Sequence, residues 1–248
     1  MADTLAGKTA FVTGAARGLG LAIGKAFLDA GTARVWFADV STDVVDVAKS
    51  LDAGGRAQGV VLDVRDEKAF AAAIALADAG PGLDIMVNNA ARTVSRSVWD
   101  ISAQEWDDVL AVNLRGVFFG CRLAGKAMRE RKRGRILNLS SLAGQRGGVV
   151  AGAHYSSSKA GIIVLTKVFA QELAGAGVTV NAIAPAAIRG PITDEMPPEK
   201  VEAMAKTIPV GRLGDDREIG AAAVYLASDA AAFVTGTTLD VNGGIFMR

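Results

Sequence analysis

The stretch that decides the fold reads Lys8-Thr-Ala-Phe-Val-Thr13, then Gly14-Ala-Ala-Arg-Gly-Leu-Gly20, then Leu21-Ala-Ile-Gly-Lys-Ala-Phe-Leu-Asp-Ala30. The first part is a short apolar run, which predicts a buried strand. The last part has helical periodicity, and Gly31 behind it is the predicted C-cap. A glycine-rich turn between a buried strand and a helix is typical of a phosphate-binding site, because the backbone can approach the ligand and the helix N-terminus offers unpaired N–H groups.

The same alternation of apolar runs and helical stretches continues along the chain. Predicted strands cover 34–39, 59–63, 83–88, 134–140, 178–183 and 238–241. Predicted helices cover about 41–53, 66–79, 102–131, the stretch from Tyr155 to about 175, 198–206 and 215–228. Continuous apolar strands that alternate with helices indicate a parallel sheet covered on both faces. We therefore expect an α/β fold of about seven strands, one doubly wound domain over 1–248 with a mobile lid at 186–214.

Composition excludes several classes of function. The 248 residues carry 27 Lys plus Arg against 26 Asp plus Glu, so no strong field is expected to attract nucleic acid or an anionic membrane. The single cysteine, Cys121, and the single histidine, His154, make neither a disulfide nor a metal cluster of the transition-metal type. No apolar signal core and no run of 18 apolar residues is present, and a cytoplasmic location is the expectation.

The glycine turn and the second strand together indicate a dinucleotide site. Gly14, Gly18 and Gly20 follow a strand and open a helix, where a pyrophosphate binds. Asp39 ends the next strand, where a carboxylate accepts hydrogen bonds from an adenosine ribose and repels a 2′-phosphate, favouring NAD over NADP. Arg17 favours NADP instead, because a cation near the turn can pair with that phosphate. The alternative interpretation of Asp39 is a solvated strand end or the N-cap of the next helix.

A candidate acid–base group lies in Tyr155-Ser-Ser-Ser-Lys159. A spacing of four places the phenol and the ammonium on one helix face. A nearby cation favours the phenolate and is expected to lower the tyrosine pKa from its usual value of about 10. Ser141, at the end of the run Arg135-Ile-Leu-Asn-Leu-Ser-Ser, can hold a substrate oxygen against the tyrosine. An ordinary amphipathic pair is the alternative interpretation of the same spacing.

Taken together, these residues resemble the short-chain dehydrogenase/reductase family over essentially the whole chain. Thr13–Gly20 is similar to its TGxxxGxG cofactor motif, and Asn88-Asn-Ala-Ala91 is similar to its NNAG motif. The resemblance implies a Rossmann-type fold and a catalytic tetrad of Asn113, Ser141, Tyr155 and Lys159. The cofactor contacts that it implies are Gly14, Arg17, Gly18, Leu19, Gly20, Asp39, Asp63, Val64, Asn89, Ala90, Tyr155, Lys159, Pro185 and Ile188.

The resemblance also implies a mechanism, in which hydride passes between a secondary alcohol carbon and the nicotinamide. Tyr155 takes or gives the hydroxyl proton, Lys159 lowers its pKa and bonds the nicotinamide ribose, and Ser141 orients the substrate oxygen. Asn113 supports a water that leads protons past Lys159. No metal is required. A homotetramer is expected, with a dimer as the alternative, because helices 102–131 and 154–175 pair between subunits in this family.

This sequence departs from the family pattern at Ala91, Ala186 and Gly190. Gly190 replaces a threonine that helps to hold the nicotinamide, and Thr193 or Arg189 is expected to take over.

Predicted walls of the substrate pocket are 92–98, 142–152 and 186–207, and their apolar character favours a cyclic or aryl-bearing alcohol over a polyol. Two other functions compete with an NAD(H)-dependent alcohol dehydrogenase. One is an NADP(H)-dependent 3-oxoacyl-carrier-protein reductase, for which the basic run 129–133 is a minor candidate docking patch. The other is a non-catalytic dinucleotide sensor or scaffold, which the intact tetrad disfavours.

Three further side chains receive structural interpretations. His154 is adjacent to Tyr155, but neighbouring helix residues point about 100° apart, so we expect it to face a neighbouring segment. Trp99 and Trp106 are expected to be packing residues at the start of the long helix, with a place at the edge of the pocket as the alternative for Trp99.

Overall fold

A single parallel sheet organises the computed structural model, which describes residues 4–52, 54–148 and 150–248. Its strand order is β3-β2-β1-β4-β5-β6-β7. The strands are β1 (Thr9–Thr13), β2 (Arg34–Asp39), β3 (Ala57–Val61), β4 (Ile85–Asn88), β5 (Gly134–Leu139), β6 (Val178–Pro185) and β7 (Thr238–Val241). The strand order reverses between β1 and β4, where Phe11 pairs with Met86, and ligands of such sheets bind at that reversal. The predicted seven-stranded doubly wound fold is confirmed.

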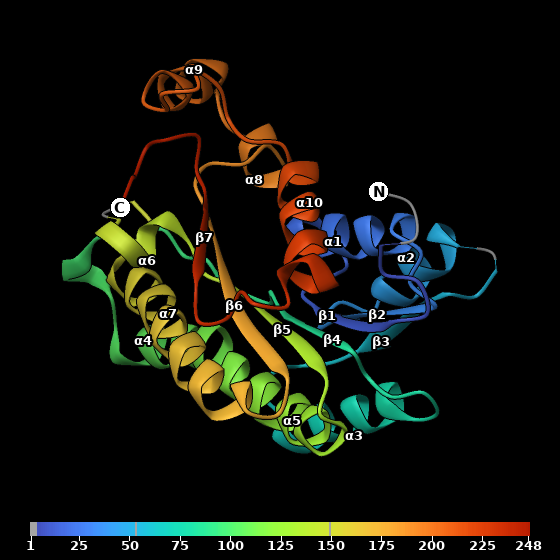
Figure 1. Cartoon of the computed structure of the whole chain (residues 1–248). Helices are drawn as coiled ribbons and strands as arrows, with labels where there is room; N and C mark the ends of the chain where they lie inside the picture. Colours follow the sequence, from blue (N-terminus) through green and yellow to red (C-terminus); the bar gives the residue numbers. More distant parts are fainter. Residues whose placement is uncertain (1–3, 53, 149) are drawn as a thin grey trace.

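Helices cover both faces of the sheet (Figure 1). One layer contains α1 (Gly18–Asp29), α2 (Val44–Leu51) and α10 (Asp216–Ala227). The other contains α3 (Glu67–Asp78), α4 (Ala103–Leu110), α5 (Gly116–Arg131) and α7 (Ala153–Ala174). Short elements complete the chain: η1 (Val98–Asp100), α6 (Leu142–Arg146), α8 (Pro191–Asp194), α9 (Pro198–Lys206) and η3 (Asp229–Ala231).

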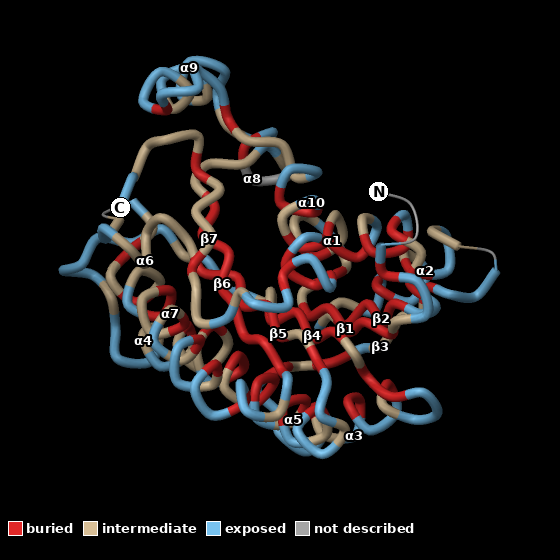
Figure 2. The backbone as a smooth tube through the Cα atoms, viewed as in Figure 1, coloured by how far each residue is buried: buried red, intermediate tan, exposed pale blue. Residues whose placement is uncertain are grey.

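Two apolar cores lie on the two faces, because successive strand residues point to opposite sides. Val12 packs with Ile23 and Phe27 of α1 in one core. Phe11 packs with Phe70 of α3 in the other, with ring centroids 6.3 Å apart. Figure 2 shows the buried strands running through the centre of the molecule. Burial on both faces explains why the strands read as continuous apolar runs.

The long helix predicted over 102–131 is interrupted. Its first part, α4, is capped by Ser102, whose Oγ accepts a hydrogen bond from the Glu105 N–H at 3.1 Å. A π-helical turn, η2 (Ala111–Arg115), then separates α4 from α5 and contains the buried Asn113. Single π turns inside α-helices are frequent at functional sites, and hydrophobic periodicity does not reveal them.

The predicted lid, 186–214, contains α8 and α9. Figure 1 shows α9 projecting away from the sheet, and its residues are exposed or half-buried (Figure 2). Pro197 and Pro198 lie at the start of α9, where the missing N–H of a proline costs nothing, because an N–H group there has no partner within the helix. The segment therefore forms a helical arm beside the carboxyl ends of the strands rather than another layer.

Candidate active site

Tyr155 and Lys159 lie one turn apart on α7, as the spacing predicts. The Lys159 Nζ is 5.6 Å from the centroid of the Tyr155 ring. The side chains of Ser141 and Thr93 lie near the phenol and act on its pKa. Three hydroxyl groups from three segments, the end of β5, the loop after β4 and α7, therefore meet at one point.

Burial governs the ionisation of this cluster. Burial raises the pKa of Tyr155, and the hydrogen bonds from Ser141 and Thr93 oppose that rise without cancelling it. Burial also lowers the pKa of Lys159 to about 8. Its Nζ donates a hydrogen bond of 2.6 Å to the carbonyl oxygen of Leu139. The Tyr155 pKa is therefore raised overall and not lowered as predicted, because desolvation outweighs the effect of Ser141 and Thr93.

Ser141 is held in place by the packing of α6 on α7. Ser140 Oγ donates to the Lys159 carbonyl oxygen at 2.8 Å. A Cβ atom on Gly144 would lie 2.5 Å from the Lys159 carbonyl carbon, so the two backbones are in close contact. Ser141 is also the N-cap of α6, and its Oγ accepts a bond of 3.1 Å from the Ala143 N–H. One hydroxyl thus caps a helix and contacts the tyrosine.

Asn113 belongs to the same site but has different partners from those expected. Its Oδ1 accepts from the Arg92 N–H at 2.7 Å, and its Nδ2 donates to the Arg92 carbonyl oxygen at 3.1 Å. The same Nδ2 donates to Ser158 Oγ at 3.1 Å, and that hydroxyl donates to the Tyr155 carbonyl oxygen at 2.7 Å. Asn113 therefore connects the loop after β4 to α7. Its predicted role toward a water near Lys159 stays a prediction.

The glycine turn has the close approaches that a phosphate site needs. Gly14 has φ of +65°, and a Cβ there would lie 2.7 Å from the Ala90 Cα. A Cβ on Gly20 would lie 2.2 Å from the Gly14 carbonyl oxygen. Asn89 holds the turn from the neighbouring strand, because its Nδ2 donates to the carbonyl oxygens of Thr13 and Gly14 at 2.9 and 3.0 Å. The first turn of α1 carries no side-chain cap, so its N–H groups face outward unpaired by side chains.

Asp39 reaches back to this turn from the end of β2. Its Oδ2 accepts from the Ala16 N–H at 3.0 Å, and its Oδ1 accepts from the Ser41 N–H at 3.0 Å. The N-cap of α2 is Asp43, so Asp39 does not have the capping role of the alternative interpretation. Arg17 is exposed on the other side of the turn. The charged group that is hydrogen-bonded to the turn is therefore the Asp39 carboxylate and not the Arg17 guanidinium.

The remaining predicted cofactor residues are distributed around the same edge. Asp63 follows β3 and forms an ion pair with Arg65 at 2.6 Å, which holds the pKa of the carboxyl below its usual value. Val64 is buried, and Leu19 is half-buried in the first turn of α1. Pro185 ends β6, and Ile188 bridges to Gly214.

The hydroxyl expected to compensate for Gly190 is engaged locally. Thr193 Oγ1 accepts from the Gly190 N–H and donates to its carbonyl oxygen, both at 2.9 Å. Arg189 is exposed.

Sequence reasoning missed Thr93 and Ser158. Thr93 falls in the predicted wall 92–98, but nothing in the pattern distinguishes it from its neighbours. Ser158 could have been found, because it lies three residues after Tyr155 and hence on the same helix face. Of the two predicted packing tryptophans, Trp106 is half-buried, whereas Trp99 is 90% exposed, so that prediction is wrong for Trp99.

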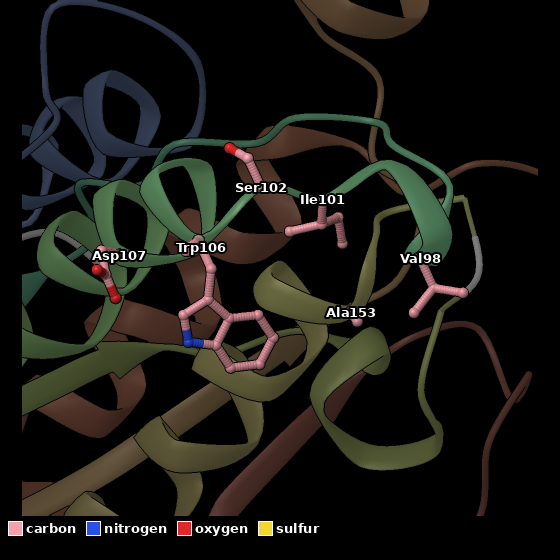
Figure 3. Close-up of a pocket in the computed structure, with 7 residues that line it drawn as sticks. Val98, Ile101, Ser102, Trp106, Asp107 and Ala153 are labelled. Carbon is pink, nitrogen blue, oxygen red and sulfur yellow. The ribbon is translucent and has the colours of Figure 1, made fainter.

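A shallow groove lies beside this site, between the start of α4 and the start of α7 (Figure 3). Its lining residues are Val98, Ile101, Ser102, Ala103, Trp106, Asp107 and Ala153. A second cavity, at the carboxyl ends of β6 and β7, includes Ala186, Ile188 and Val241. In the described part of the chain, no group of His, Cys, Asp and Glu is arranged to hold a metal ion. None of the described helices is long and apolar enough to span a membrane.

The residues present fit a dinucleotide. The closely packed glycines, the uncapped start of α1 and the anchored Asp39 converge at the reversal of the strand order. The hydroxyl cluster around Tyr155 lies further along the same edge, after β4 and β5. A nicotinamide held there would supply the hydride chemistry.

Comparison with known proteins agrees with this arrangement. A family model described as enoyl-(acyl carrier protein) reductase matches residues 14–246. An uncharacterised oxidoreductase of Mycobacterium bovis is 44% identical over 250 residues, covering 100% of both chains. The 3-oxoacyl-[acyl-carrier-protein] reductase of Vibrio cholerae is 37% identical over 98% of this chain and 99% of its own. The solved structure of a 3-oxoacyl-[acyl-carrier protein] reductase with bound NAD from Brucella melitensis has a TM-score of 0.90 and 36% identity, covering 100% of this chain and 94% of that one. The predicted family is confirmed: the chain belongs to the short-chain dehydrogenase/reductase family of oxidoreductases.

Proposed function

We propose that this protein is an NAD(H)-dependent oxidoreductase that interconverts a secondary alcohol and its ketone, with Tyr155 as the acid and base. The observation that carries the proposal is the hydroxyl cluster, in which the Ser141 and Thr93 side chains lie near the phenol, beside the Lys159 ammonium. A substrate oxygen placed between the Ser141 and Tyr155 hydroxyls lies within reach of both donors.

The protein residues have separate tasks in this reaction. In ketone reduction, Tyr155 donates its phenolic proton to the substrate oxygen, and its raised pKa suits this direction because the phenol is protonated at neutral pH. Ser141 donates a hydrogen bond to the same oxygen as negative charge develops there. Lys159, with a pKa of about 8, is mainly charged at pH 7 and stabilises the phenolate that remains. Asn113 and Ser158 hold α7 against the loop after β4.

Asp39 supports NAD over NADP. Its two carboxylate oxygens are fixed by the N–H groups of Ala16 and Ser41. A carboxylate in this position accepts ribose hydroxyls and repels a 2′-phosphate. Gly14, Gly18, Leu19 and Gly20 would hold the pyrophosphate, with Asp63 and Val64 near the adenine and Asn89, Ala90, Pro185 and Ile188 toward the nicotinamide.

A second candidate is a 3-oxoacyl-[acyl-carrier-protein] reductase, which the names of the Vibrio and Brucella relatives favour. The Brucella structure carries that name together with bound NAD, so a protein of that name can bind NAD. The predicted carrier-protein docking patch has less support. Its arginines have acidic partners within the chain, in the pairs Arg129–Glu172 (3.9 Å), Arg131–Asp78 (2.7 Å) and Arg133–Asp84 (3.1 Å).

A homotetramer is part of the proposal. Val164 and Val168 lie one turn apart on α7 and are 60% and 54% exposed, which gives this helix an apolar outer face suited to a second copy. Residues 186–214 would form the substrate lid of a single catalytic domain.

The deciding experiment is a rate screen with the purified protein. Absorbance of the reduced nicotinamide is followed with NAD and NADP on cyclic, aryl, polyol and hydroxyacyl secondary alcohols, and in reverse on the matching ketones. Turnover with NAD on one class supports the proposal and identifies the substrate class. Turnover only with NADP on 3-oxoacyl thioesters would favour the second candidate. NAD binding without turnover by any class, including 3-oxoacyl thioesters, would favour a sensor or scaffold.

A further inference from the structure

The helix that carries the catalytic tyrosine begins without a conventional cap. The N-cap of α7 is Gly152, with φ of +82°, and it has no side chain to accept a hydrogen bond. Tyr155 is the third residue of α7, and the N–H group at that position has no partner within the helix. An N-cap side chain normally accepts from it. The backbone of Tyr155 therefore needs an acceptor from elsewhere.

His154 provides that acceptor. The Tyr155 N–H donates to Nδ1 of His154 at 2.8 Å, and the imidazole is completely buried. Because Nδ1 accepts, the ring proton must lie on Nε2 in the neutral imidazole. Nε2 is 3.2 Å from Glu105 Oε1, so it donates to that carboxylate. The imidazole thus connects the first turn of α7 to α4 in one defined tautomer.

Glu105 continues the connection to the loop after β4. Arg96 donates to Glu105 through Nε at 3.3 Å and through Nη2 at 3.0 Å. The Arg96 guanidinium is the main cause that holds the pKa of Glu105 below its usual value, and the bond from His154 adds to it. The carboxylate is therefore ionised at neutral pH and can hold both donors at once.

The loop fixed in this way is the one that contacts the tyrosine hydroxyl. Thr93 lies near the phenol and acts on its pKa, and Ser95 Oγ donates to the Val150 carbonyl oxygen at 2.7 Å. A Cβ on Gly152 would lie 2.7 Å from His154 Cε1 and 3.4 Å from the Val94 carbonyl oxygen, so imidazole, cap and loop pack closely. The groove in Figure 3 borders the same connection, since Trp106 follows Glu105 and Ala153 precedes His154.

We propose that His154 is a positioning residue for the reaction, which holds the Tyr155 backbone through Nδ1 and the 92–98 pocket wall through Nε2, Glu105 and Arg96. The inference rests on the proposed function, in which Tyr155 is the acid and base. His154 itself contacts neither substrate nor cofactor in this role. The two ring nitrogens have separate tasks, one directed at the catalytic group and the other at the wall that binds the substrate.

Two variants separate these tasks. In His154→Asn the amide oxygen can replace Nδ1 as the acceptor, but the side chain is too short to reach Glu105. In His154→Gln the terminal amide can reach Glu105, but no acceptor remains at the Nδ1 position. His154→Ala removes both bonds, and Glu105→Gln keeps an acceptor for Nε2 while weakening the pairing with Arg96.

The measurement is kcat and KM for the substrate found in the rate screen, with the NAD dissociation constant and the thermal midpoint of each variant as controls. We expect His154→Asn to restore kcat about tenfold above His154→Ala, while KM stays raised. We expect His154→Gln to have the low kcat of the alanine variant with a KM close to wild type, and Glu105→Gln to raise KM more than it lowers kcat.

The inference would be overturned if His154→Asn and His154→Gln showed the same fall in kcat and the same rise in KM, in proportion to their loss of thermal stability. His154 would then be a packing residue. Wild-type constants in both variants would also overturn it. Tyr155→Phe distinguishes failure of the proposed function. If that variant turns over normally, the acid–base assignment is wrong; if it is inactive while the His154 variants behave alike, only the positioning role is wrong.

Discussion

Lys159 points its Nζ atom at the carbonyl oxygen of Leu139, at 2.6 Å, and not at the phenolic oxygen of Tyr155. The ammonium is nevertheless only 5.6 Å from the tyrosine ring centroid. Lys159 is buried and Tyr155 is half-buried, and desolvation moves the two pKa values apart, upward from 10.0 for the tyrosine and down from 10.5 to about 8 for the lysine. Both shifts favour the uncharged forms, so desolvation keeps the phenol protonated and makes the lysine proton easier to lose.

Removal of the phenol hydroxyl tests the acid–base assignment. Tyr155→Phe keeps the ring but loses the proton donor next to Ser141 and Thr93. We expect turnover to fall by a factor of about 100 to 10,000, with the NAD dissociation constant within about threefold of wild type. Steady-state rates and NAD titration measure the two quantities. Retention of full turnover would refute the assignment.

The buried charge of Lys159 should lower the free energy of unfolding of the protein. Its folded-state pKa is about 8, against 10.5 for an unperturbed lysine, so the folded state binds the lysine proton more weakly than the unfolded state does. The unfolded state binds more protons between these values, and wild-type stability should therefore rise as the pH increases from about 8 to about 10.

Lys159→Met removes this penalty. The pKa difference corresponds to about 3 kcal/mol, and loss of the bond to Leu139 returns about 1 kcal/mol, so we expect the free energy of unfolding to increase by about 2 kcal/mol at pH 7. Turnover should fall at least about 100-fold. Urea unfolding at pH 7 and pH 10 measures the effect; an equal pH dependence in variant and wild type would contradict it.

The cofactor preference should depend on the charge of Asp39. Asp39→Asn keeps an oxygen that can accept from the Ala16 N–H but removes the negative charge. We expect the ratio of kcat/KM for NAD over NADP to fall at least about tenfold, because repulsion of the 2′-phosphate disappears. Asp63→Asn is the matched control at a second carboxylate on the same edge. An unchanged ratio in Asp39→Asn would assign the preference to other residues, with Arg17 the first to test.

Most of the fold could be predicted from the sequence, since the strands are buried on both faces and their apolar runs stand out between helical stretches. The catalytic tetrad followed from the family resemblance, and the structure places Ser141, Tyr155, Lys159 and Asn113 in one region. What could not be predicted depends on contacts between segments distant in the chain. The approach of Thr93 to the Tyr155 phenol and the bond from Asn113 to Ser158 are of this kind. The sequence also did not reveal the desolvation of the Tyr155 phenol, which reversed the predicted direction of its pKa shift.

Close packing of the glycine turn gives the last prediction. A Cβ on Gly20 would lie 2.2 Å from the Gly14 carbonyl oxygen and 2.6 Å from Asn89 Nδ2, and both of these atoms belong to the hydrogen bond that holds the turn to β4. We expect Gly20→Ala to weaken NAD binding at least about tenfold and to lower the free energy of unfolding by about 2 kcal/mol. Gly175 is the matched control, because it has φ of −63° and nothing within 4 Å of an added Cβ. Gly175→Ala should leave NAD binding unchanged and stabilise the fold by up to about 1 kcal/mol. NAD titration and urea unfolding of both variants measure the difference. If the two variants bind NAD equally well, the turn does not form the pyrophosphate site.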